Sequence, residues 1–190
     1  MISVIIPTRE SERLLVRTLA CLVPGATAGL IREVILADAG STDETASVGD
    51  VAGCRFLALP GPAGARLAAT AAQARSDWLM FVVPGALLEE SWVGEARHFI
   101  ETAELHRVAV FRRVAAGQSQ ASAAAELLAL LAAALGARPK PEQGLLIAKS
   151  RYRELGGHRA AAADPERELL RRLPRSAIVR LRSGIALSRV

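Results

Sequence analysis

Apolar runs and helical patterns alternate along the first half of the chain. Four of the runs have the length and continuity of buried strands, and they cover residues 2–7, 33–37, 54–59 and 78–83. Between these runs, apolar side chains recur at helical spacing in residues 11–22 and 63–75. Strands that are apolar throughout and are separated by helices predict a mostly parallel central sheet with helices on both faces. The predicted fold class is therefore α/β.

Turn and cap residues mark the ends of these elements. Ser11 is predicted as the N-cap of the first helix, and Pro24 with Gly25 as its end. The sequence Ser-Thr-Asp-Glu at residues 41–44 is a capping box, which predicts the start of a short helix. These polar residues follow the second apolar run closely, and helix capping alone is enough to explain them.

The second half of the chain is less regular. We expect helices at residues 88–105, 118–135, 150–155 and 165–173, and strands at residues 107–112, 144–148 and 177–181. A polar linker at residues 136–141 precedes the second of these strands. The chain has 190 residues, of which 51% are hydrophobic, and this is enough for the core of one domain. We therefore predict a single domain over residues 1–190.

The chain is basic, with a net charge of +5, and Lys140 and Lys149 are its only lysines. Arginine side chains suit phosphates and acidic surfaces, so this charge is compatible with a diphosphate ligand, an anionic membrane face or nucleic acid. Aromatic residues make up only 4% of the chain, and the sequence has no zinc-ligand spacing and no aromatic RNA-binding signature. We therefore expect no nucleic-acid partner.

The cysteines and the first residues of the chain indicate in which cellular compartment the protein is expected. Cys21 lies in a helical pattern and Cys54 at the start of a predicted strand, and both are interpreted as buried reduced thiols. Met1 leads directly into the first strand, which leaves no room for a signal peptide. The apolar stretch at residues 122–137 carries Glu126 and is shorter than the ~20 residues that span a bilayer. We expect a cytoplasmic protein.

Polar side chains follow the first two predicted strands. Thr8 and Glu10 come after the first strand, and Asp38 ends the second. Because the carboxyl ends of adjacent parallel strands form the crevice where ligands bind, we expect these side chains to converge. A carboxylate there can accept hydrogen bonds from a ribose hydroxyl or a base imide. The fourth strand instead runs into Val-Pro-Gly at residues 83–85, which offer no side-chain oxygen to a hard cation.

In this order, the segments resemble family 2 glycosyltransferases, the inverting, nucleotide-sugar-dependent group with the GT-A fold. The resemblance is carried by ISVIIPTRESE, EVILADAGSTDET, GARLAATAAQARSDWLMFV, GLLIAKSRYRELGG and ADPERELLRRL, and it covers nearly the whole chain. It implies a GT-A nucleotide-diphospho-sugar transferase fold. Residues 1–86 would form the nucleotide-binding half and residues 87–190 the acceptor half.

The resemblance also implies a set of donor-binding residues. Asp38 matches the carboxylate that binds the nucleoside, with Pro7, Thr8 and Glu10 beside it, and Arg66 falls on a helix near the donor phosphates. The donor is then expected to be a uridine nucleotide sugar. Two alternatives stay open, namely that Asp38 only caps a strand end and that Arg66 is a solvated surface arginine.

The family's metal motif consists of two acidic residues, one position apart, after the fourth strand. In this chain the motif falls on Val-Pro-Gly at residues 83–85. We therefore predict no metal ligands and no cofactor, although the resemblance alone implies a divalent cation on the sugar diphosphate. In its absence, cations of the protein would have to stabilise the leaving diphosphate, and the candidates are Arg66, Lys149 and Arg151.

The resemblance places the catalytic base before the last helix. Glu166 is the candidate base that takes the proton from an acceptor hydroxyl, and Asp164 is its neighbour. The alternative is structural, because Asp-Pro-Glu is also an N-cap followed by Pro at the first helical position and an acid in the first turn. His158 follows a double glycine and either faces the acceptor cleft or lies on the surface.

The leading hypothesis is transfer of a sugar from a nucleotide-sugar donor to an acceptor hydroxyl with inversion. The alternative is a catalytically impaired relative that acts as a nucleotide-binding or assembly module. A third hypothesis is peripheral contact with the inner membrane face, through the arginine-rich surface and the apolar helix around residues 127–135. The acceptor is not identified by the sequence.

Overall fold

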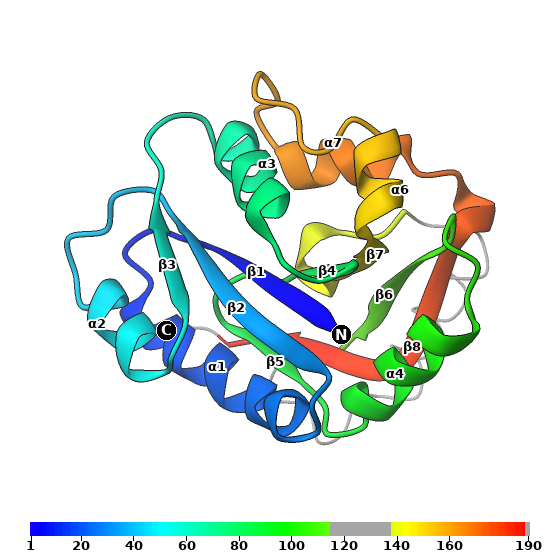
Figure 1. Cartoon of the computed structure of the whole chain (residues 1–190), viewed down its shortest axis with the longest axis horizontal. Coiled ribbons are helices and arrows are strands. Elements are labelled where there is room, and N and C mark those ends of the chain that lie inside the picture. The colour runs from blue at the N-terminus through cyan, green and yellow to red at the C-terminus, as the bar shows by residue number, and fades with distance from the viewer. Residues whose placement is uncertain (115–137, 189–190) are drawn as a thin grey trace.

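The computed structural model describes residues 1–114 and 138–188. The described strands form one eight-stranded sheet in the order β3-β2-β1-β4-β7-β6-β8-β5 (Figure 1). The α/β fold class is confirmed. The predicted helix at residues 118–135, and with it the apolar segment at 127–135, lies outside the described residues.

Four neighbouring parallel strands make up the first part of the sheet, and they are β3 (Arg55–Ala58), β2 (Ile31–Asp38), β1 (Ile2–Thr8) and β4 (Trp78–Phe81). Because they run in the same direction, their carboxyl ends lie along one edge. The second part is mixed, and it contains β7 (Leu145–Ala148), β6 (Val108–Arg113), β8 (Ile178–Leu187) and β5 (Ala86–Leu88). β7 is antiparallel to β4, so the residue before β7 lies near the carboxyl end of β4.

Helices cover both faces of the sheet, as Figure 1 shows. One face carries α1 (Glu12–Thr27), α2 (Thr45–Val51) and α4 (Trp92–Thr102), and the other carries α3 (Ala63–Gln73), α6 (Lys149–Glu154) and α7 (Pro165–Arg172). Two apolar clusters correspond to these faces, one around Trp92 and Leu15 and the other around Leu67 and Leu169. Short 3₁₀ turns at Pro141–Gln143 and Arg175–Ala177 complete the described structure.

The first helix runs past its predicted end. α1 continues through Pro24 to Thr27, and Gly29, with φ of 67°, follows its C-cap. Gly25 is needed for packing instead, because a Cβ at this position would collide with the indole ring of Trp92. The pair Pro24-Gly25 therefore marks a helix contact and not a helix end.

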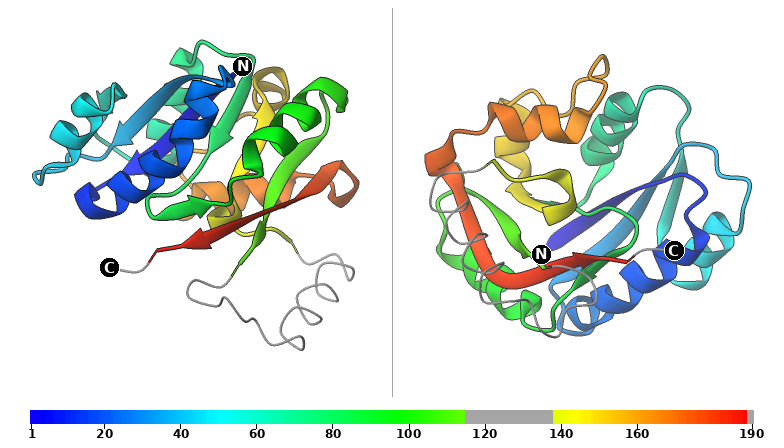
Figure 2. Two further views of the ribbon diagram at one scale, coloured as in Figure 1. Left: turned by 90° about the horizontal axis from the view of Figure 1, so that it is seen from below. Right: turned by 180° about the vertical axis from the view of Figure 1, so that it is seen from behind.

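The second half holds two further differences from the sequence predictions. Residue 88, predicted as the start of a helix, ends the short strand β5, and α4 begins only at Trp92. β8 continues beyond the predicted end at residue 181 to Leu187, as a long bent strand (Figure 2). A register shift between Val110 and Arg112 of β6 accommodates Gly184, whose N–H donates to the Glu89 carboxylate at 2.6 Å. Ser183-Gly184 therefore lies within a strand, although its composition is typical of a turn.

Candidate functional site

Asp38 and Thr8 end two adjacent strands and are paired in register across β1 and β2. The Thr8 hydroxyl donates to Asp38 Oδ1 at 2.8 Å, and Ser41 donates to the same oxygen at 2.6 Å. Asp38 Oδ2 accepts from the backbone N–H groups of Gly40 and Ser41, each at 2.7 Å. Burial alone would raise the pKa of this carboxyl, but these hydrogen bonds outweigh it and lower the pKa below its usual range. Asp38 is thus ionised and already satisfied by the loop that follows it.

Glu10, which follows β1, forms hydrogen bonds with the same loop. Its carboxylate accepts from the Thr42 N–H at 2.9 Å and from the Asp43 N–H at 3.2 Å, while its own N–H donates to Ser41 Oγ. Glu10 has φ of 46°, a left-handed conformation that is uncommon for a residue with a side chain. The two loops after β1 and β2 are therefore fixed to each other. Pro7 precedes them at a position where β1 has passed the end of its pairing with β4, so its missing N–H is tolerated.

The predicted capping box has a different role from the one expected. α2 begins at Thr45, and the Ser41 and Thr42 side chains bind Asp38 and Glu10. Asp43 accepts from the Thr45 N–H at 3.1 Å and, through its other oxygen, from the Glu12 N–H at 3.1 Å. One carboxylate thereby serves the starts of both α1 and α2.

Arg66 lies on α3 with its guanidinium against the carboxyl end of β2. It is 8% exposed, and it donates to the carbonyl oxygens of Ala37 at 3.2 Å and Gly61 at 3.0 Å. No ion pair among the described residues involves Arg66. The alternative of a solvated surface arginine is therefore excluded by its burial. A buried cation without a carboxylate partner, near the ends of β1 and β2, is suited to a phosphate ligand.

The backbone after β4 is shaped by packing. The Gly85 N–H donates to the Thr18 hydroxyl at 2.8 Å, and Gly85 has φ of 86°, which favours glycine. Residues 83–85 contribute no side-chain oxygen. Among residues 1–114 and 138–188, no group of three or more His, Cys, Asp or Glu side chains is arranged to hold a metal ion. Residues 83–85 therefore do not fit a cation held by side-chain carboxylates.

Glu166 lines a small cavity between α7 and the carboxyl end of β4. Phe81, Gly144, His158 and Leu170 are among the residues around it, and the cavity measures about 10 Å³. Burial, together with the nearby carboxylates of Asp164 and Glu142, raises the pKa of Glu166 to about 7. A carboxyl group with this pKa can both accept and release a proton near neutral pH.

Two further polar groups near this cavity, on Glu142 and Tyr152, were not singled out from the sequence. Glu142 Oε2 is buried and has no hydrogen-bond partner within the described part of the chain. The Tyr152 hydroxyl contacts His158 Nδ1 at 2.8 Å and accepts from the His158 backbone N–H at 3.0 Å. His158 is 4% exposed, so the surface alternative for this residue is excluded. The only sequence signal for the pair was the double glycine that turns the chain between them.

A comparison with protein families finds that residues 3–122 match the family described as Glycosyl transferase family 2. This chain belongs to glycosyl transferase family 2. The resemblance drawn from the sequence segments is thereby confirmed. A comparison with curated proteins finds no match.

The solved structures that share this fold include glucosyl-3-phosphoglycerate synthase from Mycobacterium tuberculosis. Its complex with Mn²⁺ and uridine-diphosphate-glucose has 23% sequence identity and a TM-score of 0.72, over 100% of this chain and 72% of that chain. Its complex with Mg²⁺ and uridine-diphosphate has 22% identity and a TM-score of 0.71, with the same coverage. A third complex holds Mn²⁺, uridine-diphosphate and glucosyl-3-phosphoglycerate, at 23% identity and a TM-score of 0.71, again over 100% of this chain and 72% of that chain.

These neighbours contradict the prediction that no cofactor is involved, since their structures hold Mn²⁺ or Mg²⁺ beside the uridine nucleotide. The prediction was wrong because it considered only the side chains after β4. Mg²⁺ usually keeps several waters and binds through one or two carboxylates together with substrate phosphates. Waters and substrate phosphates are not visible in an amino-acid sequence.

The remaining predicted residues of this family 2 member are placed as follows. Asp164 is exposed and caps α7, where its Oδ1 accepts from the Arg167 N–H at 2.9 Å.

Lys149 follows Ala148, which pairs with Trp78 at the amino end of β4. The ammonium group of Lys149 donates to the carbonyl oxygens of Ala72 and Ala74. The prediction that Lys149 stands near the donor diphosphate is therefore wrong, because that end of β4 lies at the opposite sheet edge. Arg151 pairs with Glu154 at 3.0 Å.

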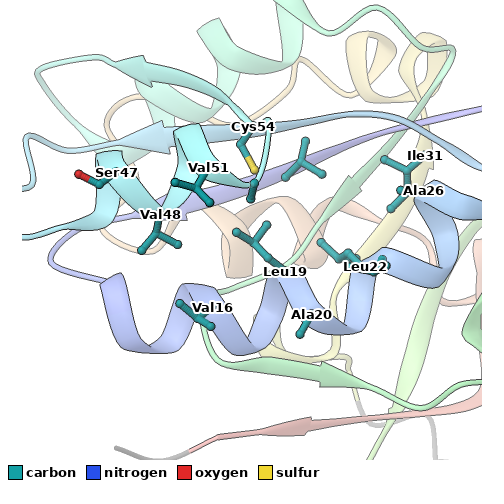
Figure 3. Close-up of a pocket in the computed structure, with 13 residues that line it drawn as sticks. Val16, Leu19, Ala20, Leu22, Ala26, Ile31, Ser47, Val48, Val51 and Cys54 are labelled. Carbon is teal, nitrogen blue, oxygen red and sulfur yellow. The ribbon is translucent and has the colours of Figure 1, made fainter.

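A larger apolar groove lies on the other face of the sheet, between α1 and α2 (Figure 3). It measures about 540 Å³, and Val16 and Val51 at its sides are exposed. Its lining includes no charged residue, and its polar side chains are Ser47 and Cys54. Burial raises the pKa of the free Cys54 thiol to about 11, so the thiol stays protonated. The groove has no group that could neutralise a diphosphate, so it is not the donor site.

The membrane hypothesis gains no structural support. Within the described ranges, no helix combines the length and apolar character needed to cross a bilayer. The apolar segment on which peripheral contact was based is outside those ranges. Cytoplasmic location and the absence of a nucleic-acid partner stay predictions.

Proposed function

We propose that the protein transfers a sugar from a uridine nucleotide sugar to an acceptor hydroxyl with inversion. The observation that carries this proposal is the position of Glu166, whose raised pKa of about 7 is combined with a cavity at the carboxyl end of β4. This is the sheet edge at which Asp38 and Thr8 end the neighbouring strands. Ligands of open α/β sheets bind at such an edge.

In this proposal Glu166 is the base. Its carboxylate takes the proton of the acceptor hydroxyl as the hydroxyl oxygen attacks the anomeric carbon of the sugar. The bond from the anomeric carbon to the diphosphate oxygen breaks at the same time, and the electron pair leaves with the uridine diphosphate. Attack opposite to the leaving group inverts the anomeric centre. Asp164 keeps the Glu166 pKa raised through its charge and caps the helix on which Glu166 lies.

The donor contacts of this proposal follow the strand ends. Asp38, Thr8, Glu10 and Pro7 form the loop pair against which the nucleoside binds, and the Arg66 guanidinium contacts the diphosphate. Support for Arg66 comes from its burial without a carboxylate partner. Asp38 already accepts four hydrogen bonds, so a nucleoside has to replace the Ser41 or Thr8 hydroxyl to reach it.

A divalent cation is part of the proposed donor complex, by similarity to the neighbours that contain Mn²⁺ or Mg²⁺ with a uridine nucleotide. Such a cation would neutralise charge on the diphosphate. Residues 83–85 do not supply carboxylates for it. Its coordination would therefore have to come from the diphosphate, from water and from groups outside this segment.

The test is a transfer assay with uridine-diphosphate-glucose and Mn²⁺. Phosphoglyceric acid and glycerol 3-phosphate, which the neighbours bind, are the first acceptors, followed by a panel of sugars and polyols. We expect Glu166→Gln to lower kcat by about 10²–10⁴-fold, which is the range for loss of a general base. Glu154→Gln is the matched control, because Glu154 is an exposed acid on the neighbouring helix α6. Undiminished transfer by Glu166→Gln would remove Glu166 from the mechanism.

Donor binding is tested separately by calorimetry with uridine diphosphate and Mn²⁺. Arg66→Met is expected to weaken binding at least tenfold, equivalent to about 1.4 kcal/mol. Arg75→Met serves as the control, since Arg75 is an exposed arginine just after α3. The comparisons lend no support to the alternative of an impaired relative. Normal nucleotide binding combined with no transfer to any acceptor would favour that alternative.

A further inference from the structure

The hydrogen bonds of Tyr152 determine which nitrogen of the His158 ring carries the proton. The Tyr152 hydroxyl accepts from the His158 backbone N–H, so its own proton must go to another acceptor. Tyr152 is 5% exposed, and its hydroxyl has no acceptor among the described residues other than His158 Nδ1, at 2.8 Å. Nδ1 therefore carries no proton, and the ring proton is on Nε2.

The surroundings keep this ring uncharged. Phe81 contacts it edge to face, with ring centroids 4.9 Å apart, and Phe81 also stacks on Tyr152. The Arg172 guanidinium lies beside the ring because it donates to the carbonyl oxygens of Leu155 and Gly157. Burial, with the positive charge of Arg172, lowers the pKa of His158 to about 4. His158 is therefore neutral at the pH where Glu166 changes its charge.

The side-chain hydrogen bond of His158 involves Nδ1, not the Nε2–H group. The Nε2–H group is on the side of the ring away from Tyr152. His158 and Glu166 line the same cavity, whose volume of about 10 Å³ is close to the ~10–15 Å³ that one water needs. His158 and Glu166 thus adjoin a space of about the size of one hydroxyl group.

We propose that His158 binds the acceptor substrate, as a fixed neutral donor whose Nε2–H contacts the oxygen of the hydroxyl that Glu166 deprotonates. This rests on the proposed function. The ligand class is an alcohol or polyol, because its hydroxyl oxygen accepts from Nε2–H while its hydroxyl proton points at Glu166. An amine acceptor would be disfavoured at this position, since a protonated amine has no lone pair to accept with. The imidazole selects and orients the acceptor and does not exchange a proton with it.

The first measurement needs no substrate. The chain has three histidines, so the nitrogen-15 spectrum of the histidine-labelled protein is simple, and His158→Phe assigns the His158 signals. We expect a protonated Nε2 and a bare Nδ1 that do not change between pH 6 and pH 8. Tyr152→Phe keeps the ring stack but frees Nδ1, and it should produce a mixture of the two tautomers. A ring protonated on Nδ1 in the wild type, or one that titrates in this range, would overturn the proposal.

The second measurement uses the transfer assay with uridine-diphosphate-glucose and its best acceptor. His158→Phe should raise the acceptor KM about tenfold and leave the donor KM unchanged, and His158→Gln, which restores an N–H donor, should recover part of the loss. His106→Phe is the control, because His106 is exposed and pairs with Glu104. If His158→Phe does not fold, the acceptor KM of His158→Gln and the nitrogen-15 spectrum of the wild type test the acceptor role instead. An unchanged acceptor KM in folded His158→Phe would refute the acceptor role.

The two proposals can fail separately. Absence of transfer by the wild type, with normal folding, would overturn the proposed function and the acceptor role of His158 with it. The spectrum would then still show whether the ring is a fixed donor. Transfer that depends on Glu166 but not on His158 would overturn only the present inference.

Discussion

The proposed donor edge, formed by Asp38 and Glu10 with the loops after β1 and β2, and the proposed acceptor cavity beside Glu166 differ in how their polar groups are hydrogen-bonded. At the donor edge, Asp38 and Glu10 are ionised acceptors whose oxygens are filled by neighbouring N–H and O–H groups. Near the proposed acceptor cavity, Glu142 Oε2 is buried without a hydrogen-bond partner among the described residues, and the pKa of Glu166 is raised. The first arrangement stabilises two loops, whereas the second leaves groups available for chemistry.

The difference shows what burial does to a carboxylate. Asp38 is 1% exposed, yet its pKa is lowered, because hydrogen bonds to the charged form outweigh the cost of desolvation. The pKa of Glu166 is raised by burial first and then by the nearby carboxylates of Asp164 and Glu142, and no hydrogen bond from a described residue to its charged form offsets these effects. Burial by itself therefore does not identify the reactive acid. The partners of each carboxyl group do.

The largest effect in this comparison is expected at Asp38. Asp38→Ala removes four hydrogen bonds to an ionised acceptor and leaves the Thr8 hydroxyl buried without its partner, so the free energy of unfolding should fall by about 2–4 kcal/mol. Asp38→Asn keeps one acceptor oxygen, so its free energy of unfolding should fall by less than that of Asp38→Ala. Urea denaturation measures both. A loss below about 1 kcal/mol in Asp38→Ala would mean that water replaces the carboxylate and that the loop does not depend on it.

A smaller change in the free energy of unfolding, of opposite sign, is expected for Glu166→Gln. The folded-state pKa of about 7 is above the usual value of 4.5, so the folded protein keeps a proton that the unfolded chain releases. This contribution to stability is present at low pH and is lost as pH rises through about 7. Glu166→Gln should therefore be more stable than the wild type by about 1–2 kcal/mol at pH 8, and the difference should shrink towards pH 5.

Unfolding curves of both proteins at pH 5, 6, 7 and 8 test this expectation, with Glu154→Gln as the control for loss of an exposed charge. The carboxylates of Asp164 and Glu142 raise the pKa of Glu166, and the nearby His158 ring is neutral, so this ring does not offset their repulsion. A stability difference that stays constant from pH 5 to pH 8 would show that Glu166 titrates as it does in the unfolded chain. The contrast between the two regions would then disappear.

The smallest effect is expected at Glu10. Its carboxylate is exposed, so loss of its hydrogen bonds in Glu10→Ala should cost about 0.5–1 kcal/mol. Glu10→Gly removes the same bonds but suits the φ of 46°, and it should therefore cost less. Thermal unfolding compares the two variants. If Glu10→Gly is the less stable protein, the backbone freedom of glycine in the unfolded chain outweighs the strain at this position.

Local patterns in the sequence were sufficient for the elements around the donor edge. The continuous apolar runs predicted β1 to β4, since such runs are typical of strands buried on both faces. Thr8 and Asp38 follow directly from the ends of two of these runs, and parallel strands bring such ends together. Asp164 as the N-cap of α7 was also visible, because capping depends on residues only a few positions apart.

The tertiary structure decided the rest. Lys149 was placed at the wrong sheet edge because the antiparallel pairing of β7 with β4 is a contact between segments far apart in the chain. The strand β5 and the extension of β8 stabilise each other by pairing, and neither has a pattern that indicates a strand alone. The position of the His158 ring proton depends on Tyr152, and the raised pKa of Glu166 depends on its burial, on Asp164 and on Glu142. Asp164 is close to Glu166 in sequence, whereas the burial of Glu166 and the approach of Glu142 are set by folding. Protonation states are set by the groups around a residue in space, and its neighbours in sequence supply only some of them.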